Sequence, residues 1–285
     1  MVTFDVDTQH RITLNERNWD ARTPIHVQSE FYGLGTRDPQ DWIAPFEWEA
    51  LGALAGVDVA HLQCHLGVET MALAQAGARV VGLDISARSV EQAAGAARTA
   101  GLDIEYAKAD VYDAVGVLGA ERFDIVYTGK GSLCYLPDLS GWAEVVTGLL
   151  RPGGFVYVVE FHPLLTAFGA NADPDDPTGL TIRQDYLEGR GAIEHDSRHT
   201  YTDGPALEND TVHYEWSHGI GEVVTALLGA GLVLDDLTEL DVLPWPRWPS
   251  MSRTDYGWWH VGAGAQPRVP TLYALRARKT SSALS

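Results

Sequence analysis

Cysteine is scarce in this chain of 285 residues, which contains only Cys64 and Cys134. Two cysteines cannot build the disulfide framework of a small secreted domain, and so few are usual in a reducing compartment. The N-terminal residues 1–11 include Asp5 and Asp7, and they lack the apolar core of a secretory signal. We therefore expect a cytoplasmic protein in which both cysteines lie in interior segments.

Long hydrophobic runs are also absent. No stretch of about 18 uncharged apolar residues occurs, so no helix is expected to span a membrane. Positive charge is scarce, and the formal net charge is −19. Such an acidic surface repels nucleic-acid phosphates and anionic lipid, although it is equally compatible with a role in solubility alone. We expect a small-molecule substrate and neither a nucleic acid nor a membrane as partner; a monomer and a homodimer both remain open.

Apolar residues make up 45% of the chain, which suffices for one large α/β domain with insertions. One stretch predicts a strand, a turn, a helix and a second strand, at Val59–Gln63, Gln63–Gly67, Val68–Ala76 and Arg79–Leu83. This order is typical of a nucleoside-binding βαβ unit, in which the turn offers backbone N–H groups at a helix N-terminus. Asp84 follows Gly67 by 17 residues, about where an acid that binds a ribose diol is expected.

Residues 59–84 resemble the first two motifs of class I S-adenosylmethionine-dependent methyltransferases. The turn is similar to the H-L-Q-C-H-x-G loop of a small-molecule branch, in which Gln63 and His65 replace two of the usual three glycines. Three later stretches extend the resemblance: KADVYD at 108–113, FDIVYT at 123–128 and LLRPGGFVYVVEFHP at 149–163. The resemblance implies an α/β fold with a doubly wound, seven-stranded, mostly parallel sheet in the order 3-2-1-4-5-7-6.

The whole chain, residues 1–285, is expected to form one methyltransferase domain with two additions. Residues 1–55 would be an N-terminal arm and lid, with residues 1–23 as a polar arm that could be ordered against the body. Glu30–Tyr32 would cover the cofactor, and a helix packed on the sheet edge is the alternative. Residues 163–215 interrupt the α/β alternation and predict an inserted lid or small antiparallel ribbon on the substrate side; a linker is the alternative.

The resemblance implies S-adenosyl-L-methionine as cofactor and S-adenosyl-L-homocysteine as product. Asp84 would hold the ribose hydroxyls, Asp110 would take the adenine amino group, and the N–H of Val111 would meet a ring nitrogen. A turn residue at a strand end is the alternative role of Asp110. The expected cofactor-binding residues share the ends of the first four strands or the lid, and they are Tyr32, Gln63, Cys64, His65, Gly67, Asp84, Ile85, Ser86, Asp110, Val111, Thr128 and Gly129.

Aromatic side chains are expected around the mouth of the site. Tyr135, Tyr201, Trp216 and Trp245 would wall the substrate pocket, and they suggest a flat or aromatic acceptor. Lys130, in the loop after the fourth strand, would either pair with a carboxylate there or remain solvated.

Methyl transfer from a sulfonium is an in-line displacement, to which the protein contributes mainly positioning and exclusion of water. A base is needed only for an acceptor that is protonated at neutral pH. His218 and Glu222 are four residues apart on a helix predicted over 218–228, where the carboxylate would orient the imidazole; an inconsequential surface pair is the alternative. His162, after a strand predicted over 155–161, is a third candidate, and it would equally cap the turn before Pro163.

His61, Cys64 and His65 suggest a metal site only if further ligands come from elsewhere, so we expect none. His65 is expected to pack near the cofactor, and Cys64 to be a small buried residue. A redox pair of Cys64 and Cys134 is likewise disfavoured.

The resulting hypothesis is a methyltransferase that acts on an O, N, C or S nucleophile of a small molecule. One alternative is a nicotinamide-dependent oxidoreductase on the same kind of sheet, which would require G-x-G-x-x-G at the turn. The other is a protein that binds S-adenosylmethionine without transferring its methyl group.

Overall fold

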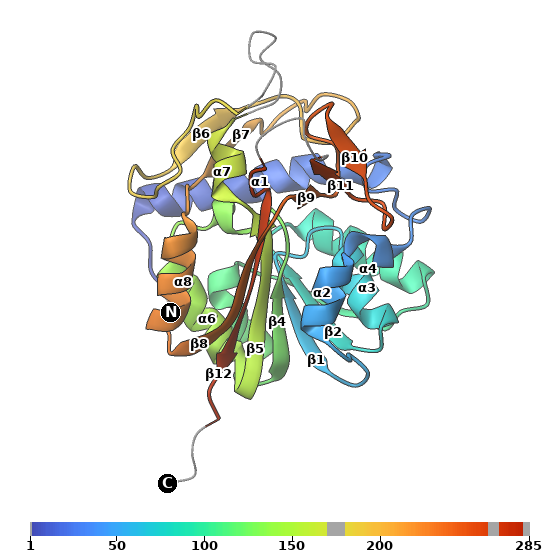
Figure 1. Cartoon of the computed structure of the whole chain (residues 1–285), viewed down its shortest axis with the longest axis vertical. Coiled ribbons are helices and arrows are strands. Elements are labelled where there is room, and N and C mark those ends of the chain that lie inside the picture. Colours follow the sequence, from blue (N-terminus) through green and yellow to red (C-terminus); the bar gives the residue numbers. More distant parts are fainter. Residues whose placement is uncertain (1, 170–179, 262–267, 282–285) are drawn as a thin grey trace.

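A seven-stranded sheet forms the centre of the computed structural model, which describes residues 2–169, 180–261 and 268–281. Its strands are β1 (Asp58–Leu62), β2 (Arg79–Asp84), β3 (Glu105–Lys108), β4 (Phe123–Thr128), β5 (Leu150–Phe161), β8 (Leu232–Leu240) and β12 (Leu272–Lys279). Their order is β3-β2-β1-β4-β5-β12-β8 (Figure 1). The first five are parallel, and β12 runs antiparallel to both β5 and β8. The fold class and strand order predicted from the sequence are confirmed.

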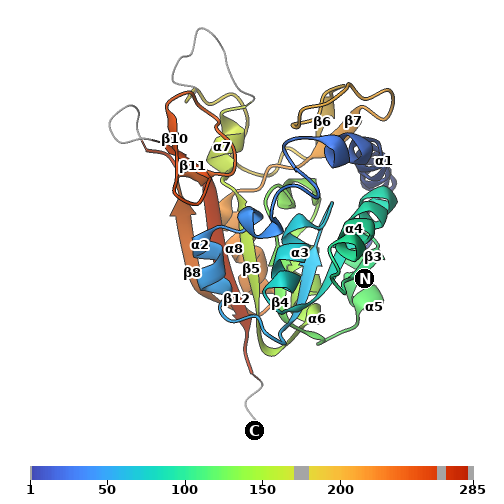
Figure 2. The same ribbon diagram turned by 90° about the vertical axis from the view of Figure 1, so that its right-hand side faces the viewer.

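Helices cover both faces of this sheet (Figures 1 and 2). The helices are α2 (Pro45–Leu51), α3 (Val68–Gln75), α4 (Ala87–Thr99), α5 (Ala114–Leu118), α6 (Leu139–Leu149) and α8 (Ile220–Gly229). On one face, Leu51 of α2 and Leu73 of α3 pack with Val59 of β1 in one buried cluster. On the other face, α5, α6 and α8 contribute to a second cluster that contains the fully buried Trp142. Burial on both faces explains why the central strands β1, β2 and β4 are rich in apolar residues.

A further layer lies beyond the carboxyl ends of the parallel strands. It consists of α1 (Val6–Gln28), η1 (Pro39–Trp42), η2 (Val111–Asp113), η3 (Leu133–Tyr135), α7 (Pro163–Ala167), the hairpin β6 (Ile193–Asp196) and β7 (Val212–Glu215), and a small sheet of β9 (Val242–Leu243), β10 (Met251–Arg253) and β11 (Trp259–Val261). Figure 2 shows α1 and the hairpin on one side of this layer, and α7 with β10 and β11 on the other. The layer therefore brings chain segments from both ends of the sequence over the sheet edge.

The N-terminal segment is a helix, α1, which the interpretation of residues 1–23 as a polar arm did not specify. Asp5 caps α1, and the buried face of the helix includes Asn15 and Arg22. The amide of Asn15 bonds both the N–H and the C=O of Tyr214 in β7, at 2.7 and 2.8 Å. A helix that packs through polar contacts has no apolar stripe, so hydrophobic periodicity does not detect it.

Two other boundaries differ from prediction. Strand β5 begins at Leu150 and includes the Arg-Pro-Gly-Gly segment that was expected to precede it. Helix α8 begins at Ile220, so His218 lies before it. The antiparallel ribbon predicted in the insert is present as β6 and β7, whereas residues 170–179 of the same insert lie outside the described residues.

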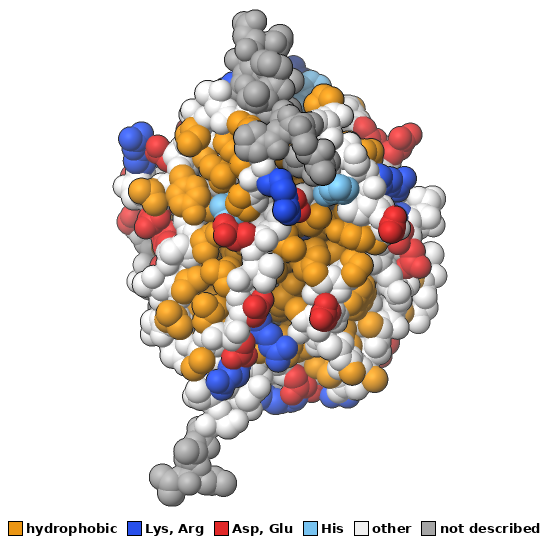
Figure 3. Space-filling view, in the orientation of Figure 1, with side chains coloured by type: hydrophobic (Ala, Val, Ile, Leu, Met, Phe, Trp, Pro, Cys, Tyr) orange, Lys and Arg blue, Asp and Glu red, His pale blue; other side chains and the backbone are white. Residues whose placement is uncertain are grey.

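The face of the molecule in Figure 3 carries hydrophobic patches that acidic and basic side chains separate. Edge strand β8 exposes parts of Val233 and Leu237. Asp235 of the same strand bonds Arg278 of β12 at 2.7 Å, and charges of this kind discourage pairing between sheet edges. Among the described helices, none is long and apolar enough to cross a membrane.

A pair of glycine substitutions tests how closely the chain packs at the start of α3. Gly67 and Gly101 have φ of 69° and 70°, but a Cβ at Gly67 would lie 2.5 Å from the Tyr106 hydroxyl, whereas one at Gly101 would meet nothing within 4 Å. Gly101→Ala should cost about 1–2 kcal/mol of unfolding free energy because of its left-handed backbone. Gly67→Ala should cost about 1–3 kcal/mol more because it also overpacks. Equal losses in urea unfolding would contradict the close approach of Tyr106.

Candidate functional site

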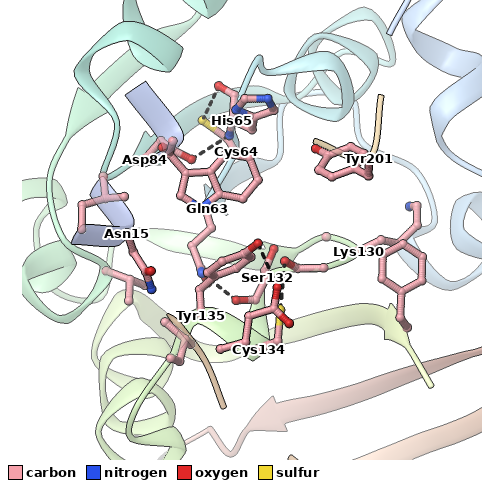
Figure 4. A pocket seen from close by; sticks show the side chains of 18 of the residues that line it. Asn15, Gln63, Cys64, His65, Asp84, Lys130, Ser132, Cys134, Tyr135 and Tyr201 are labelled. Atoms are coloured by element: carbon pink, nitrogen blue, oxygen red, sulfur yellow. Dashed lines mark hydrogen bonds between the residues drawn. The ribbon is translucent and has the colours of Figure 1, made fainter. Parts of the chain in front are cut away.

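A cavity of about 860 Å³ lies at the carboxyl edge of the sheet. Its wall includes the turn between β1 and α3, the ends of β2 and β5, the loops after β3 and β4, and parts of α1, the hairpin and the segment after β9. Figure 4 shows this cavity, with Gln63, Asp84 and Ser132 among the labelled side chains. The volume is near the upper end of the range for small-molecule sites.

The turn between β1 and α3 forms the floor at one side and is held in an unusual conformation. Gln63 and His65 have φ of 55° and 46°, and Gly67 has 69°. Two non-glycine residues in this region cost about 1–2 kcal/mol each, so the surroundings must hold them there. The side-chain amide of Gln63 donates to the carbonyl of Ser132 at 2.8 Å, while its Oε1 is buried without a hydrogen-bond partner. This oxygen is an acceptor available to a ligand.

Asp84, at the end of β2, fixes that turn. Its Oδ2 accepts the N–H of His65 and its Oδ1 accepts the N–H of Ser86, both at 2.8 Å. The side chain is buried at the cavity wall. Burial raises the pKa of Asp84 to about 6, against the lowering effect of the two N–H groups. The carboxylate is therefore mostly charged at neutral pH, and it becomes protonated under mildly acidic conditions.

Asp110 and Val111 form the next part of the wall, in the loop after β3. The Asp110 carboxylate accepts the N–H of Tyr112 at 3.1 Å and caps η2. Burial raises the pKa of Asp110 as well. Because β2 and β3 are parallel neighbours with Asp84 opposite Lys108, the two acids lie at adjacent strand ends and face one cavity.

A chain of hydrogen bonds joins the turn to the layer above it. His65 shares a hydrogen bond of 2.8 Å with His26 of α1, whose other ring nitrogen meets Thr200 of the insert at 2.6 Å. On its far side His65 meets Ser89 of α4 at 3.0 Å. Burial lowers the pKa of His26 to about 3 and that of His65 well below its usual value. Both rings are therefore neutral, and they couple the turn to α1 and the insert without a buried charge.

Lys130, in the loop after β4, is a buried ion-pair partner and is not solvated. Its ammonium lies 3.2 Å from Glu47 and 3.8 Å from Glu69. Glu47 is itself wholly buried and accepts the hydroxyl of Tyr127. Lys130, Glu69 and His61 line the cavity together. Burial raises the pKa of Glu69, and it lowers that of His61 to about 3. This corner thus presents charged groups of both signs.

The hairpin contributes a polar cluster that sequence reasoning missed. Glu215 and His195 line the cavity, with 3.7 Å between Glu215 Oε2 and His195 Nε2. The Tyr135 hydroxyl donates to Glu215 at 3.3 Å, and Arg22 donates to His213, which stacks on His195. Burial lowers the pKa of His195, so this imidazole is neutral at pH 7. His213 and Glu215 are two residues apart and share one face of β7, and His195 is the cross-strand partner of His213. The sequence alone does not show that these three side chains come together, because it does not give the pairing of the two strands.

Most of the predicted binding residues meet at this cavity. Those that line it are Tyr32, Gln63, Cys64, His65, Asp84, Ile85, Asp110, Val111, Gly129, Tyr135, Tyr201 and Trp245. Gly67 begins α3 behind the turn, and the fully buried Ser86 donates to Asp20 of α1. Thr128 is fully buried, and Trp216 donates its backbone N–H to Cys134. These four support the wall without forming part of it.

The three predicted bases do not face the cavity, and this prediction is corrected. Nδ1 of His218 hydrogen-bonds the carboxylate of Glu222 at 2.7 Å, and its Nε2 hydrogen-bonds the carbonyl of Leu136. Glu222 lines a separate surface hollow beside α6 and α8. His162 caps α7 through Nδ1 and bonds Glu239 through Nε2, at 2.7 Å. Because the ring nitrogens of both histidines are already engaged, neither histidine is placed to accept a proton from a ligand in the cavity.

The free cysteines and the histidines of the turn fit other roles than metal binding. Cys64 and Cys134 are both unpaired, and burial raises the pKa of each thiol. His61 bonds Thr70 at 2.8 Å. Within the described part of the chain, no group of three or more His, Cys, Asp or Glu side chains is arranged to hold a metal ion.

Residues 59–154 match the model of the methyltransferase domain family. They contain most of β1, the whole of β2 to β4, the turn, Asp84 and Asp110, so the resemblance inferred from the motifs is confirmed for this part of the chain. The ubiquinone biosynthesis O-methyltransferase of Bordetella avium is 32% identical over 146 residues, which are 50% of this chain and 56% of that protein. The chain thus spans about half the length of the curated relatives it matches.

Solved structures extend the likeness of fold to most of the chain. A putative S-adenosylmethionine-dependent methyltransferase from Listeria monocytogenes superposes with a TM-score of 0.58, at 17% identity, over 87% of this chain and 100% of that one. The [4+2]-cyclase SpnF superposes with a TM-score of 0.50, also at 17% identity, over 80% and 77%. The fold is therefore shared with an S-adenosylmethionine-dependent methyltransferase and with a protein whose name describes a different reaction.

The buried ion pair at Lys130 gives a prediction about stability. Lys130→Met leaves the carboxylate of Glu47 buried without a cation, so unfolding free energy should fall by about 3–5 kcal/mol in urea titration. The double variant Glu47→Gln/Lys130→Met removes the stranded charge and should recover most of that loss. A double variant no more stable than Lys130→Met would show that the pair acts through packing rather than charge.

Proposed function

We propose that the chain is an S-adenosylmethionine-dependent methyltransferase that acts on a small molecule and releases S-adenosylhomocysteine. The observation that carries the proposal is the cavity at the strand ends, where Asp84, Asp110 and the left-handed turn share one wall inside the matched methyltransferase domain. The cytoplasmic location, the monomeric or dimeric state and the absence of nucleic-acid and membrane partners remain predictions from the sequence.

The residues present fit an adenosine. Asp84 offers a buried carboxylate to the ribose hydroxyls, and Asp110 with the N–H of Val111 offers an acceptor and a donor to the adenine edge. The unpartnered Oε1 of Gln63 supplies a further acceptor at the same wall. Buried polar atoms without partners are rare in folded proteins, which supports a ligand at this place.

The mixed charges around Lys130 fit the amino acid part of the cofactor. Lys130 is suited to a carboxylate, and Glu69 is suited to an ammonium group, since each lines the cavity. When bound, the cofactor supplies an electrophilic methyl group, and the chain supplies position and a site shielded by α1 and the insert. The roles of residues 1–55 and 163–215 as lids are part of this proposal.

For an acceptor that must lose a proton, we assign the base to His195. Its imidazole is neutral at pH 7 and lines the cavity, and Glu215 stabilises the protonated form that would result. Tyr135 of η3 holds Glu215 in place, and Arg22 of α1 holds His213. The acid–base pair thus comes from the hairpin.

Two other functions use the same fold. A nicotinamide-dependent oxidoreductase is disfavoured by the methyltransferase domain match and by the side chains of Gln63 and His65 at the turn. A protein that binds S-adenosylmethionine without methyl transfer has one supporting observation, the likeness to a cyclase. Thermal unfolding in the presence of S-adenosylhomocysteine or of NAD distinguishes the methyltransferase from the oxidoreductase. S-adenosylhomocysteine should raise the unfolding temperature, whereas NAD should not. Mass detection of a methylated product tests the second.

The raised pKa of Asp84 predicts how binding depends on pH. Ribose hydroxyls donate to the charged carboxylate, so the affinity for S-adenosylhomocysteine should be constant above about pH 7. Below pH 6, where Asp84 is protonated in the free protein, affinity should fall about tenfold per pH unit. Isothermal titration calorimetry measures this, and Asp84→Asn should bind weakly at every pH. A wild-type affinity independent of pH between 5 and 7 would contradict the assignment.

Substitution of His195 tests the proposed base. With an acceptor that carries an O–H or N–H nucleophile, His195→Asn should lower kcat by about 10²- to 10⁴-fold, because general base catalysis typically contributes that much. Binding of S-adenosylhomocysteine should change less than twofold. His199→Asn is the matched control, since His199 is exposed in the same insert and away from the cavity. A wild-type rate in His195→Asn would remove the residue from the mechanism.

A further inference from the structure

A single arginine lines the cavity, among the residues that the structure describes. Arg247 lies between β9 and β10, in the aromatic segment that also carries Trp245 and Trp248. Its Nη2 donates to the carbonyl of Gly169, beyond the C-terminus of α7, at 2.6 Å. The guanidinium carbon lies 5.4 Å from the centre of the Trp248 ring. These contacts fix the side chain between the small sheet and α7.

Among the described residues, Arg247 is a cation without an acidic partner. No carboxylate of the described residues lies within ion-pair distance of its guanidinium, and its Nε is buried with no hydrogen-bond partner. Burial lowers its pKa, with no neighbouring charge to oppose that change. Arg247 is half-buried, and a charge that has lost part of its hydration is ordinarily compensated by a partner. An anion bound in the cavity would provide the missing partner.

The other cation of the wall differs in this respect. Lys130 pairs with Glu47, lies beside Glu69 and is assigned above to the carboxylate of the cofactor, so it is not available to the acceptor. The remaining charged groups of the lining are carboxylates: Glu69, Asp84, Asp110 and Glu215. A negatively charged acceptor would be repelled over most of this surface and attracted only near Arg247. The charge pattern therefore fixes one orientation for such a molecule.

The groups near Arg247 indicate what the rest of that molecule would be. Phe161 and Trp245 line the cavity and meet edge to face, with ring centroids 5.0 Å apart. Leu165 of α7 adds an aliphatic surface. A planar guanidinium beside aromatic and aliphatic side chains suits a planar carboxylate attached to an apolar or aromatic body.

We propose that Arg247 binds a carboxylate of the methyl acceptor, which makes the acceptor an aromatic or apolar carboxylic acid. This inference rests on the proposed function, because it assigns the second ligand of the same cavity. It does not assign the atom that receives the methyl group.

Binding measurements test the proposal without a known acceptor. Protein saturated with S-adenosylhomocysteine is titrated by calorimetry with benzoate, phenylacetate and trans-cinnamate, and with the amide of each acid. At least one acid should bind the wild type at millimolar concentration or below, and at least tenfold more tightly than its amide. In Arg247→Gln that acid should lose at least tenfold in affinity, while the amide should change less than twofold. Arg247→Lys keeps the charge but not the planar guanidinium, so its affinity for the acid should lie between those of the wild type and of Arg247→Gln.

Arg253→Gln is the matched control, because Arg253 is exposed in β10 and does not line the cavity; it should bind the acid like the wild type. Binding of S-adenosylhomocysteine to each variant shows that the fold and the cofactor site persist. The proposal is overturned if no acid binds, if acids and amides bind equally, or if Arg247→Gln binds the acid as the wild type does. Failure of S-adenosylhomocysteine to bind the wild type would instead reject the proposed function.

Discussion

The carboxylate of Asp84 holds together the two parts of the chain on which the cavity depends. It accepts one backbone N–H from the turn after β1 and another from the start of α4. The turn places Gln63 and His65 in the left-handed region, where side chains are strained. Because the bond from His65 N–H to Asp84 is made inside the protein, away from competing water, it helps to hold that conformation. The shape of the cavity floor follows from this one interaction.

The same turn connects the sheet to the layer above it. His65 meets His26 of α1, and His26 meets Thr200 of the insert, so three distant segments are joined by neutral hydrogen bonds. A glycine at position 65 would have no side chain to make these contacts. A histidine in place of a glycine therefore strains the backbone of the turn, but its side chain links the turn to α1 and the insert. Helix α1 and the hairpin of the insert then place Arg22, His195 and Glu215 close to one another beside the cavity.

The sheet and the part of the cavity wall formed at its strand ends were predictable from the sequence, because they depend on local patterns. Apolar runs ending on Asp84 and Asp110 mark strand ends, and parallel strands bring their ends to one edge. The rest depends on contacts between distant segments. Helix α1 was missed because Asn15 and Arg22 give it a polar buried face. His218 was misassigned because residue spacing along a helix cannot show that the second ring nitrogen of His218 hydrogen-bonds the carbonyl of Leu136. Arg247 and Glu215 became candidates only when their surroundings were known.

A crystal structure of the protein with S-adenosylhomocysteine tests the central claim most directly. The account predicts both ribose hydroxyls within hydrogen-bond distance of the Asp84 carboxylate, with adenine beside Asp110 and Val111. Adenosine bound elsewhere, or bound here with Asp84 in contact only with His65 and Ser86, would contradict it.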